Sequence, residues 1–555
     1  MIEEKENEPH AKAQGRKGGE VSAPLRLCAS FCCNAGFVLC FALLIRCGVL
    51  WLTPDALQND PDDYLRLATN LVEHGTFGSG GAPAAYRPPL YPMVLTGCVL
   101  VGAHDSATVI VAMMMLHVLL GVATVGLVFL LGRWWGLGCC AAAVAALLVA
   151  CDPILLRSSS LVMTETLATF LATAGLLALT WAEQRGTATG LGWQLNCHPN
   201  TKTTSAAIVG SQRLPENCRP PSRIPGAVDS RLFLPQIVAG IVLALAALCR
   251  PAFLLWTLAV AVVLCWRACR SIKGDSPIFA ETKIGTVPNS RGPTARGRIA
   301  SRLRAPAAFA LGAIIVLSPW AIRNQIQFGR PIITTTHGGY TLLLANNPEF
   351  YDWLRHGSWG SVWRADRFNA DWDRRRPSDE LQADRLAYAE AWQTIRTQPG
   401  TFLYACAVRI GRFWSPLPHR LTADETPLHR LSRYAVALWY LPEFALALLG
   451  IWSARRGKGR EKKEEGKRER GQILTSPAPN PPPPHPPSAW LWGVLLVGCL
   501  LAGHVVYWTD MRMRAPIMPV VAIFAAAGLP CCRPRDNLMP RKVDSLSKSS
   551  GDNAS

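Results

Sequence analysis

Ten apolar runs divide this sequence, and they restrict the possible folds more than any other feature. A membrane-spanning helix needs about 20 mostly apolar residues, and these runs have about that length. Short basic stretches separate many of them, so the sequence predicts an all-α polytopic membrane protein with about ten transmembrane helices. The runs are 31–53, 107–132, 137–156, 165–182, 233–249, 251–267, 306–322, 432–453, 488–508 and 516–532.

Composition agrees with this interpretation and excludes several classes of protein. Hydrophobic residues make up 50% of the 555 residues and charged residues only 17%, whereas soluble domains carry about 25% charge. The net charge of +19 is explained by Lys and Arg in cytoplasmic loops, and we expect no nucleic-acid partner. Most of the 18 cysteines lie in apolar runs or adjacent pairs, so they do not form a disulfide framework.

The side of the membrane on which each loop lies depends on the apolar segment 90–104. If it does not span, all the basic stretches and both termini share one side, as the positive-inside rule prefers. We therefore interpret 90–104 as an interfacial or re-entrant piece. The predicted organisation is a basic cytoplasmic tail (1–30), a membrane core (31–453), a charged and Pro-rich cytoplasmic linker (454–487), the last transmembrane helices (488–532) and a cytoplasmic tail (533–555). Within the core lie an outer loop (54–106), cytoplasmic insertions (183–232 and 268–305) and an extracytoplasmic segment (323–431).

Carboxylates gather where the predicted helices meet the outer face. Asp60, Asp62 and Asp63 follow the first helix, and Glu165 begins a later one after Thr164. Each has two interpretations that do not exclude each other. An acidic side chain at a helix start can cap free backbone N–H groups. It can also act as a general base, and an acidic group at the membrane edge is costly unless it has a partner.

Arginines recur at the same membrane boundary, where the positive-inside rule expects few. One interpretation is that they reach lipid headgroups or pair with the carboxylates. The other is a phosphate site, because a guanidinium group matches the geometry of phosphate oxygens. Several arginines at one depth beside acidic residues favour a phosphate-bearing lipid substrate. They are Arg87, Arg250, Arg323, Arg512 and Arg514.

These pieces, in this order, resemble the bacterial branch of the dolichyl-phosphate-mannose-protein mannosyltransferases, glycosyltransferase family 39, which are membrane enzymes of the GT-C fold. The resemblance covers most of residues 31–530 outside the cytoplasmic insertions. The matching stretches are Asp60-x-x-x-Tyr64-x-x-Leu67-Ala68, Tyr86-Arg-Pro-Pro-Leu-Tyr-Pro92, Thr164-Glu-Thr-Leu167, Arg250-Pro251, Pro319-Trp-Ala-Ile-Arg-Asn324, Gly338-Gly339 with Asn346-Asn347, and Arg512-Met-Arg-Ala-Pro-Ile-Met-Pro519.

The resemblance implies an enzyme that transfers a sugar from a polyprenyl-phosphate donor to a protein, lipid or glycan acceptor on the outer face of the cytoplasmic membrane. It maps the key carboxylate to Asp60. Many relatives carry a second acidic residue directly afterwards, where this chain has Pro61, so Asp63 and Glu165 are the further catalytic candidates. One base and an arginine clamp on the leaving phosphate suffice, and attack opposite the phosphate predicts inversion. No cofactor is required. A divalent cation, which some GT-C enzymes use, would bind the Asp60–Asp63 cluster and Glu165.

Two other functions remain open from the sequence. A transporter or lipid flippase would carry charges near the bilayer midplane and paired broken helices, whereas here the helix interiors are nearly uncharged. A non-catalytic scaffold related to the transferases is the second, and the intact Asp60 and arginine set argue against it. Within 323–431, a helical pattern covers 380–396. The tryptophans there either stack on sugars or form a small core; they are Trp353, Trp359, Trp363 and Trp372.

Overall fold

The computed structural model describes most of the predicted membrane core. Its described residues are 35–53, 55–103, 105–191, 233–273, 295–357, 360–420, 425–468 and 489–529. The predicted tails 1–30 and 533–555 lie outside these residues, as do large parts of the insertions 183–232 and 268–305 and of the linker 454–487.

The described residues contain eight helices that are long and apolar enough to cross a membrane, or up to nine if one bent pair is a single span. The all-α polytopic fold predicted from the sequence is therefore confirmed. The spans lie in α2 (Ala35–Leu52), α5 (Ser106–Trp134), α8 (Glu165–Leu191), α10 (Ala252–Lys273), α11 (Ala295–Phe328), α17 (Pro427–Arg468), α18 (Ala489–Val506), and the 3-10 helix η4 (Met511–Ile517) continued by α19 (Met518–Gly528).

Two of the ten predicted runs form shorter or broken helices. The run 233–249 becomes α9 (Leu234–Cys249), a helix of 16 residues, which would extend about 24 Å. The run 137–156 divides into α6 (Cys139–Cys151) and α7 (Pro153–Ser159), which meet at an angle of 51°. The break has a local cause, because Pro153 has no backbone N–H and the Asp152 side chain accepts the N–H of Leu155 at 2.9 Å to start a new helix.

The centre of the bundle is formed by α8 and α19, whose apolar windows are 72% and 78% buried inside the protein, against 17% for α2 at the periphery. Small residues allow the closest helix pairs. Gly240 on α9 and Gly312 on α11 face each other's backbone, and a Cβ on either would clash with a carbonyl oxygen of the partner helix. Close approach at small residues is the usual way in which helices associate within a membrane.

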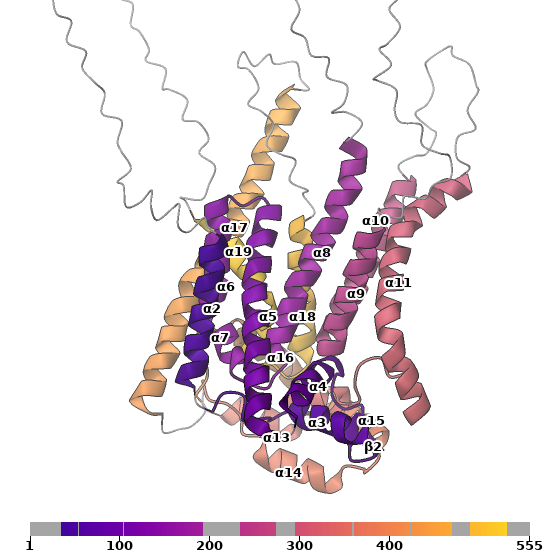
Figure 1. Cartoon of the computed structure of the whole chain (residues 1–555), viewed down its shortest axis with the longest axis vertical. Helices are drawn as coiled ribbons and strands as arrows, with labels where there is room; N and C mark the ends of the chain where they lie inside the picture. Colours follow the sequence, from indigo (N-terminus) through magenta and orange to yellow (C-terminus); the bar gives the residue numbers. More distant parts are fainter. Residues whose placement is uncertain are drawn as a thin grey trace, which may run out of the picture.

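Most of the structure outside the spans gathers at one end of the bundle, below called the site end. Figure 1 shows α3 (Tyr64–His74), α4 (Leu90–Gly102) and α13 to α15 at this lower end, whereas α8 and α17 reach the opposite end. A short antiparallel hairpin connects α3 to α4, with β1 (Gly78–Ser79) paired to β2 (Ala82–Pro83). The 13 residues of α4 extend about 20 Å, too short to cross the bilayer, as expected of 90–104.

Five helices between α11 and α17 complete the site end. They are α12 (Gly338–Ala345), α13 (Pro348–His356), α14 (Asp366–Arg375), α15 (Glu380–Thr397) and α16 (Pro399–Trp414). The helical pattern predicted over 380–396 is thus confirmed. Trp363 and Trp372 are 7% and 4% exposed within a shared apolar core, to which Trp353 packs. Trp359 lies outside the described residues.

Candidate active site

The Asp60 carboxylate is placed at the N-terminus of α3. Its Oδ1 accepts the backbone N–H of Tyr64 at 2.8 Å, and its Oδ2 accepts those of Leu65 and Arg66 at 2.8 and 3.1 Å. These are the free N–H groups of the first helical turn, so Asp60 caps α3. Burial raises the pKa of Asp60, and the three backbone hydrogen bonds oppose that rise.

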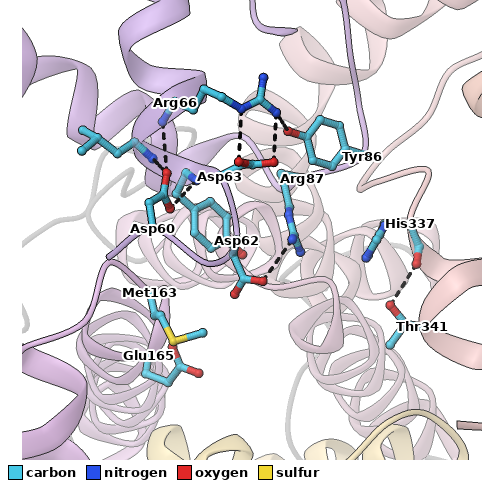
Figure 2. Close-up of polar contacts among 12 residues, drawn as sticks. Asp60, Asp62, Asp63, Arg66, Tyr86, Arg87, Met163, Glu165, His337 and Thr341 are labelled. Atoms are coloured by element: carbon cyan, nitrogen blue, oxygen red, sulfur yellow. Dashed lines mark hydrogen bonds and ion pairs between the residues drawn. The ribbon is translucent and has the colours of Figure 1, made fainter. Parts of the chain in front are cut away.

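Asp62 and Asp63 pair with different arginines, as Figure 2 shows. Asp62 accepts from Arg87 at 3.0 Å. Asp63 has a left-handed φ of 62° and forms a two-bond pair with Arg66 at 3.1 and 2.9 Å. The hydrogen bonds from Arg66 lower the pKa of Asp63, while Arg66 also donates to the Tyr86 hydroxyl at 2.9 Å. The three carboxylates therefore have three different environments within four residues.

Glu165 is only 2% exposed at the start of α8 and lies between two of the predicted arginines. Its Oε1 is 3.2 Å from Arg250, the residue that ends α9, and 3.9 Å from Arg512 on η4. Methionine sulfurs complete the surroundings, because Arg250 contacts Met513 and Arg512 contacts Met163. The sequence indicated that an acidic group at this depth needs a partner. Arg250 and Arg512 both provide one.

The Asp62–Arg87 pair and the arginines around Glu165 belong to one cluster around the Tyr64 ring. Arg87 lies over this ring, with its guanidinium carbon 5.5 Å from the ring centre. Asp62, Glu165 and Tyr64 all act electrostatically on Arg512. The structure therefore brings together five side chains from α8, η4 and the loops that follow α2, α3 and α9. Below they are called the charged cluster: Asp62, Arg87, Glu165, Arg250 and Arg512.

Arg323 lies outside the charged cluster and holds the outer loop in place. It donates to the carbonyl oxygens of Ala84 at 2.8 Å and Phe77 at 2.9 Å. Glu380, at the start of α15, binds the same loop from the other side by accepting the N–H of Ala85 at 3.1 Å. Glu380 also accepts from the Thr336 hydroxyl. The structure thus gives Arg323 a structural role in the outer loop, and its predicted phosphate contact stays a prediction.

Arg514 also lies outside the charged cluster. It is fully buried, donates to the carbonyl oxygens of Phe413 and Ser415 at 3.1 and 2.6 Å, and stacks on the Tyr440 ring at 4.2 Å. The Tyr440 hydroxyl in turn donates to Asp152 at 2.9 Å. Arg514 therefore ties η4 to α16, to α17 and to the break between α6 and α7.

Buried charges occur deeper in the bundle than the sequence suggested. Arg46 on α2 and Glu443 on α17 are 2% and 3% exposed, although the helix interiors were expected to be nearly uncharged. Arg46 donates to the Ala150 carbonyl at 3.4 Å and acts electrostatically on Asp152, as do Arg514 and Glu443. Both charges therefore belong to the network around Asp152, which fastens helices together.

His337 is a neighbour of the cluster that sequence reasoning missed. Figure 2 shows Arg87 between Asp62 and His337, and Arg87 acts electrostatically on the His337 ring. Burial, followed by the charge of Arg87, lowers the pKa of His337 to about 3. The only sequence signal was its position directly before Gly338-Gly339. Among the described residues, no group of three or more His, Cys, Asp or Glu side chains is placed to hold a metal ion.

Solved structures similar to this chain include an oligosaccharyltransferase and a protein O-mannosyltransferase. The solved structure of the archaeal oligosaccharyltransferase AglB from Archaeoglobus fulgidus, in complex with an inhibitory peptide and a dolichol-phosphate, is 14% identical with a TM-score of 0.43, and covers 89% of this chain and 50% of that one. The S. cerevisiae protein O-mannosyltransferase Pmt1–Pmt2 complex, bound to the sugar donor, is 16% identical with a TM-score of 0.34, and covers 57% of this chain and 36% of that one. The chain thus spans about half the length of AglB.

Sequence comparison gives a match to one family model over part of the chain. No curated protein matches the sequence. The model of the dolichyl-phosphate-mannose-protein mannosyltransferase family matches residues 91–198, a stretch that contains Glu165 and its helix. The resemblance predicted from the order of the motifs is thereby confirmed, and over residues 91–198 the chain carries the sequence signature of the dolichyl-phosphate-mannose-protein mannosyltransferases.

Proposed function

We propose that this protein is an integral-membrane glycosyltransferase that moves a hexose from a polyprenyl-phosphate donor to an acceptor hydroxyl. The observation that carries the proposal is the charged cluster beside Asp60, at the site end of a membrane bundle. Arg87, Arg250 and Arg512 converge there on two carboxylates. The Nε of Arg87 is buried and has no hydrogen-bond partner among the described residues. An anionic phosphate would use such donors.

The proposed step uses one base and the arginines. The acceptor oxygen attacks the anomeric carbon while its proton passes to a carboxylate. The bond from that carbon to the phosphate oxygen breaks, and its electron pair leaves with the polyprenyl phosphate. The guanidinium groups stabilise the charge that develops on the phosphate. Because the attack comes from the side opposite the leaving group, the configuration at the anomeric carbon inverts.

Asp60 is the proposed base. A carboxylate oxygen has two lone pairs, and within the described part of the chain Asp60 Oδ1 accepts a single hydrogen bond, from Tyr64. The cap fixes the carboxylate while one lone pair is left for a proton. Asp62 and Asp63 are engaged by Arg87 and Arg66, which makes them weaker candidates. We propose that Glu165, between two arginines, orients Arg250 and Arg512 toward the donor.

The same arrangement supports the proposed placement of the site at the membrane surface. A polyprenyl phosphate keeps its chain in the bilayer and presents its phosphate at the surface, which is where the charged cluster lies if the spans cross the bilayer. The basic stretches 1–27, 183–232, 268–305, 454–487 and 533–555 favour a cytoplasmic position for both termini. We propose that the site end faces outward from the cytoplasmic membrane.

The test is sugar transfer by the purified chain in nanodiscs from a panel of radiolabelled polyprenyl-phosphate hexoses. We compare the wild type with Asp60→Asn, which keeps a side-chain oxygen for the cap but removes the base. Removal of a general base lowers the rate by about 10²- to 10⁴-fold. Label that moves only with the wild type supports the transferase and its base.

A matched control separates capping from catalysis. Asp379 caps α15 by accepting the N–H of Gln382 at 2.9 Å and lies outside the charged cluster. Asp379→Asn is therefore expected to keep the wild-type rate. Equal transfer by the wild type and Asp60→Asn would retain the enzyme class but move the base to Asp62, Asp63 or Glu165. Failure of every donor to support transfer would argue against the proposed function itself.

A further inference from the structure

A second cavity at the site end has no part in the proposed reaction. It lies between α13, α16 and the start of α17 and has a volume of about 750 Å³. None of its lining residues belongs to the charged cluster. The wall combines aromatic rings with small residues, namely Trp353, Tyr404 and Tyr434 with Ala407, Gly411 and Gly360. The cavity is therefore roomy, with an apolar wall.

The charged residues of this cavity are mostly arginines. Among the described residues that line it, Arg412, Arg420, Arg430 and Arg433 stand against one acidic residue, Glu425, and these five side chains sum to a formal charge of +3. Arg433 pairs with Glu425 at 2.6 Å. The other three guanidinium groups form no ion pair with any described residue. Like charges around one cavity repel each other unless an anion lies between them.

Arg412 shows this excess of positive charge most clearly. Its guanidinium carbon lies 5.1 Å from the ring centre of Trp353 and 5.9 Å from that of Phe350. It forms no side-chain hydrogen bond to the described part of the chain. Burial, followed by the charge of Arg409, lowers its pKa, and the charge of Asp510 acts in the opposite direction. An arginine held against aromatic rings with its N–H groups free is well placed to bind a phosphate.

The rim of the cavity continues onto an apolar surface. On α17, Leu431 and Leu438 are 66% and 73% exposed, and they lie on the same helix face as Tyr434 of the cavity wall. On α16, Leu403 beside Tyr404 is 68% exposed. Because α17 is one of the membrane-spanning helices, this surface is where lipid chains would lie. A ligand that joins a phosphate to a hydrocarbon chain fits both parts.

We propose that this cavity binds the phosphate headgroup of an anionic membrane lipid. Arg412, Arg420 and Arg430 hold the phosphate oxygens, and the hydrocarbon chain runs along the exposed leucines of α17. This site is separate from the donor site proposed above and does not depend on it. Its phosphate lipid comes either from the bilayer or from the polyprenyl phosphate pool, and the test distinguishes the two.

The test counts bound lipids on the full chain by native mass spectrometry in a neutral detergent. The probes are dioleoyl phosphatidylglycerol, farnesyl phosphate and inorganic phosphate. The variant Arg420→Gln/Arg430→Gln changes two exposed side chains, so folding should be preserved, and Arg412→Gln is tested separately. The control Arg385→Gln/Arg396→Gln removes the same charge from exposed positions of α15. We expect at least tenfold weaker lipid binding in the cavity variants and wild-type binding in the control.

The outcomes separate this site from the donor site. Farnesyl phosphate would also occupy the donor site, and Arg512→Gln should remove that second molecule alone. Tighter binding of phosphatidylglycerol identifies a bilayer lipid, and tighter binding of farnesyl phosphate identifies a polyprenyl phosphate; both support the proposal. Inorganic phosphate that binds as tightly as the lipids, or cavity variants that bind lipid like the wild type, would overturn it. None of these readouts requires sugar transfer.

Discussion

Arg512 and Arg514 lie two residues apart on η4 and contact entirely different partners. Arg512 reaches Asp510 at 3.2 Å and Glu165 at 3.9 Å, with its side chain 38% exposed. Arg514 is fully buried and donates to the Phe413 and Ser415 carbonyls. One arginine thus fixes the 3-10 turn that presents the other to the charged cluster.

This relationship predicts that substitutions of Arg514 and Arg512 affect different quantities, namely stability for Arg514 and sugar transfer for Arg512. Arg514→Met removes two hydrogen bonds and one of the cations that act electrostatically on the buried Asp152, and the loss of a buried charged partner costs about 3 kcal/mol. We expect a clear fall in Tm by differential scanning fluorimetry in detergent. Arg512→Gln should leave Tm nearly unchanged and lower sugar transfer at least tenfold. An unchanged Tm for Arg514→Met, with transfer lost, would instead place Arg514 in the site.

The pH dependence of transfer provides a test of Asp60. A general base must be unprotonated, so the rate falls as the pH drops through its pKa. Burial raises that pKa, which moves the fall to a higher pH than the value of about 3.9 for an ordinary Asp. We expect kcat/KM of the wild type to show this acidic limb, and the residual activity of Asp60→Asn to lack it. The same limb in both proteins would show that another group titrates.

The sequence predicts the membrane bundle well because span length and apolar composition are local properties. The short helix α9 and the break between α6 and α7 depart from the predicted spans, and both are also local features. The run 137–156 breaks where Asp152 caps α7, and the same carboxylate then serves as a partner for Tyr440, 288 residues away. No pattern near Asp152 in the sequence reveals that second contact.

The site was predictable only in part. The first outer loop and Glu165 were singled out because carboxylates and arginines are unusual at that membrane boundary. Which arginine meets which carboxylate depends on helix packing, so Arg87 and Arg323 are indistinguishable in sequence although one joins the cluster and the other binds loop carbonyls. Glu380 and His337 carry no motif of their own, and only the fold brings them to the outer loop and to Arg87.

Removing the hydrogen bonds that hold the outer loop is expected to lower the local stability of the loop before it affects sugar transfer. Glu380 accepts the N–H of Ala85, and Arg323 donates to Ala84 and Phe77. Hydrogen bonds to charged groups contribute about 1.5–3 kcal/mol, so Glu380→Ala and Arg323→Ala should each raise amide hydrogen exchange over residues 77–86. Peptides from α8 serve as the internal control. Exchange that rises equally throughout the chain would indicate global destabilisation in place of local release.

Trp372 tests whether the tryptophans of the site end form a core or a sugar platform. The side chain is 4% exposed and packs in the apolar core with Phe368 and Trp363. Replacing a buried Trp by Ala costs about 3–5 kcal/mol, so Trp372→Ala should lower Tm strongly, whereas Trp372→Phe should recover much of the loss. Transfer should fall in proportion to the folded fraction, with the KM for the acceptor unchanged. A raised KM with the wild-type Tm would instead mean that Trp372 contacts the acceptor, which its burial among α12 to α15 argues against.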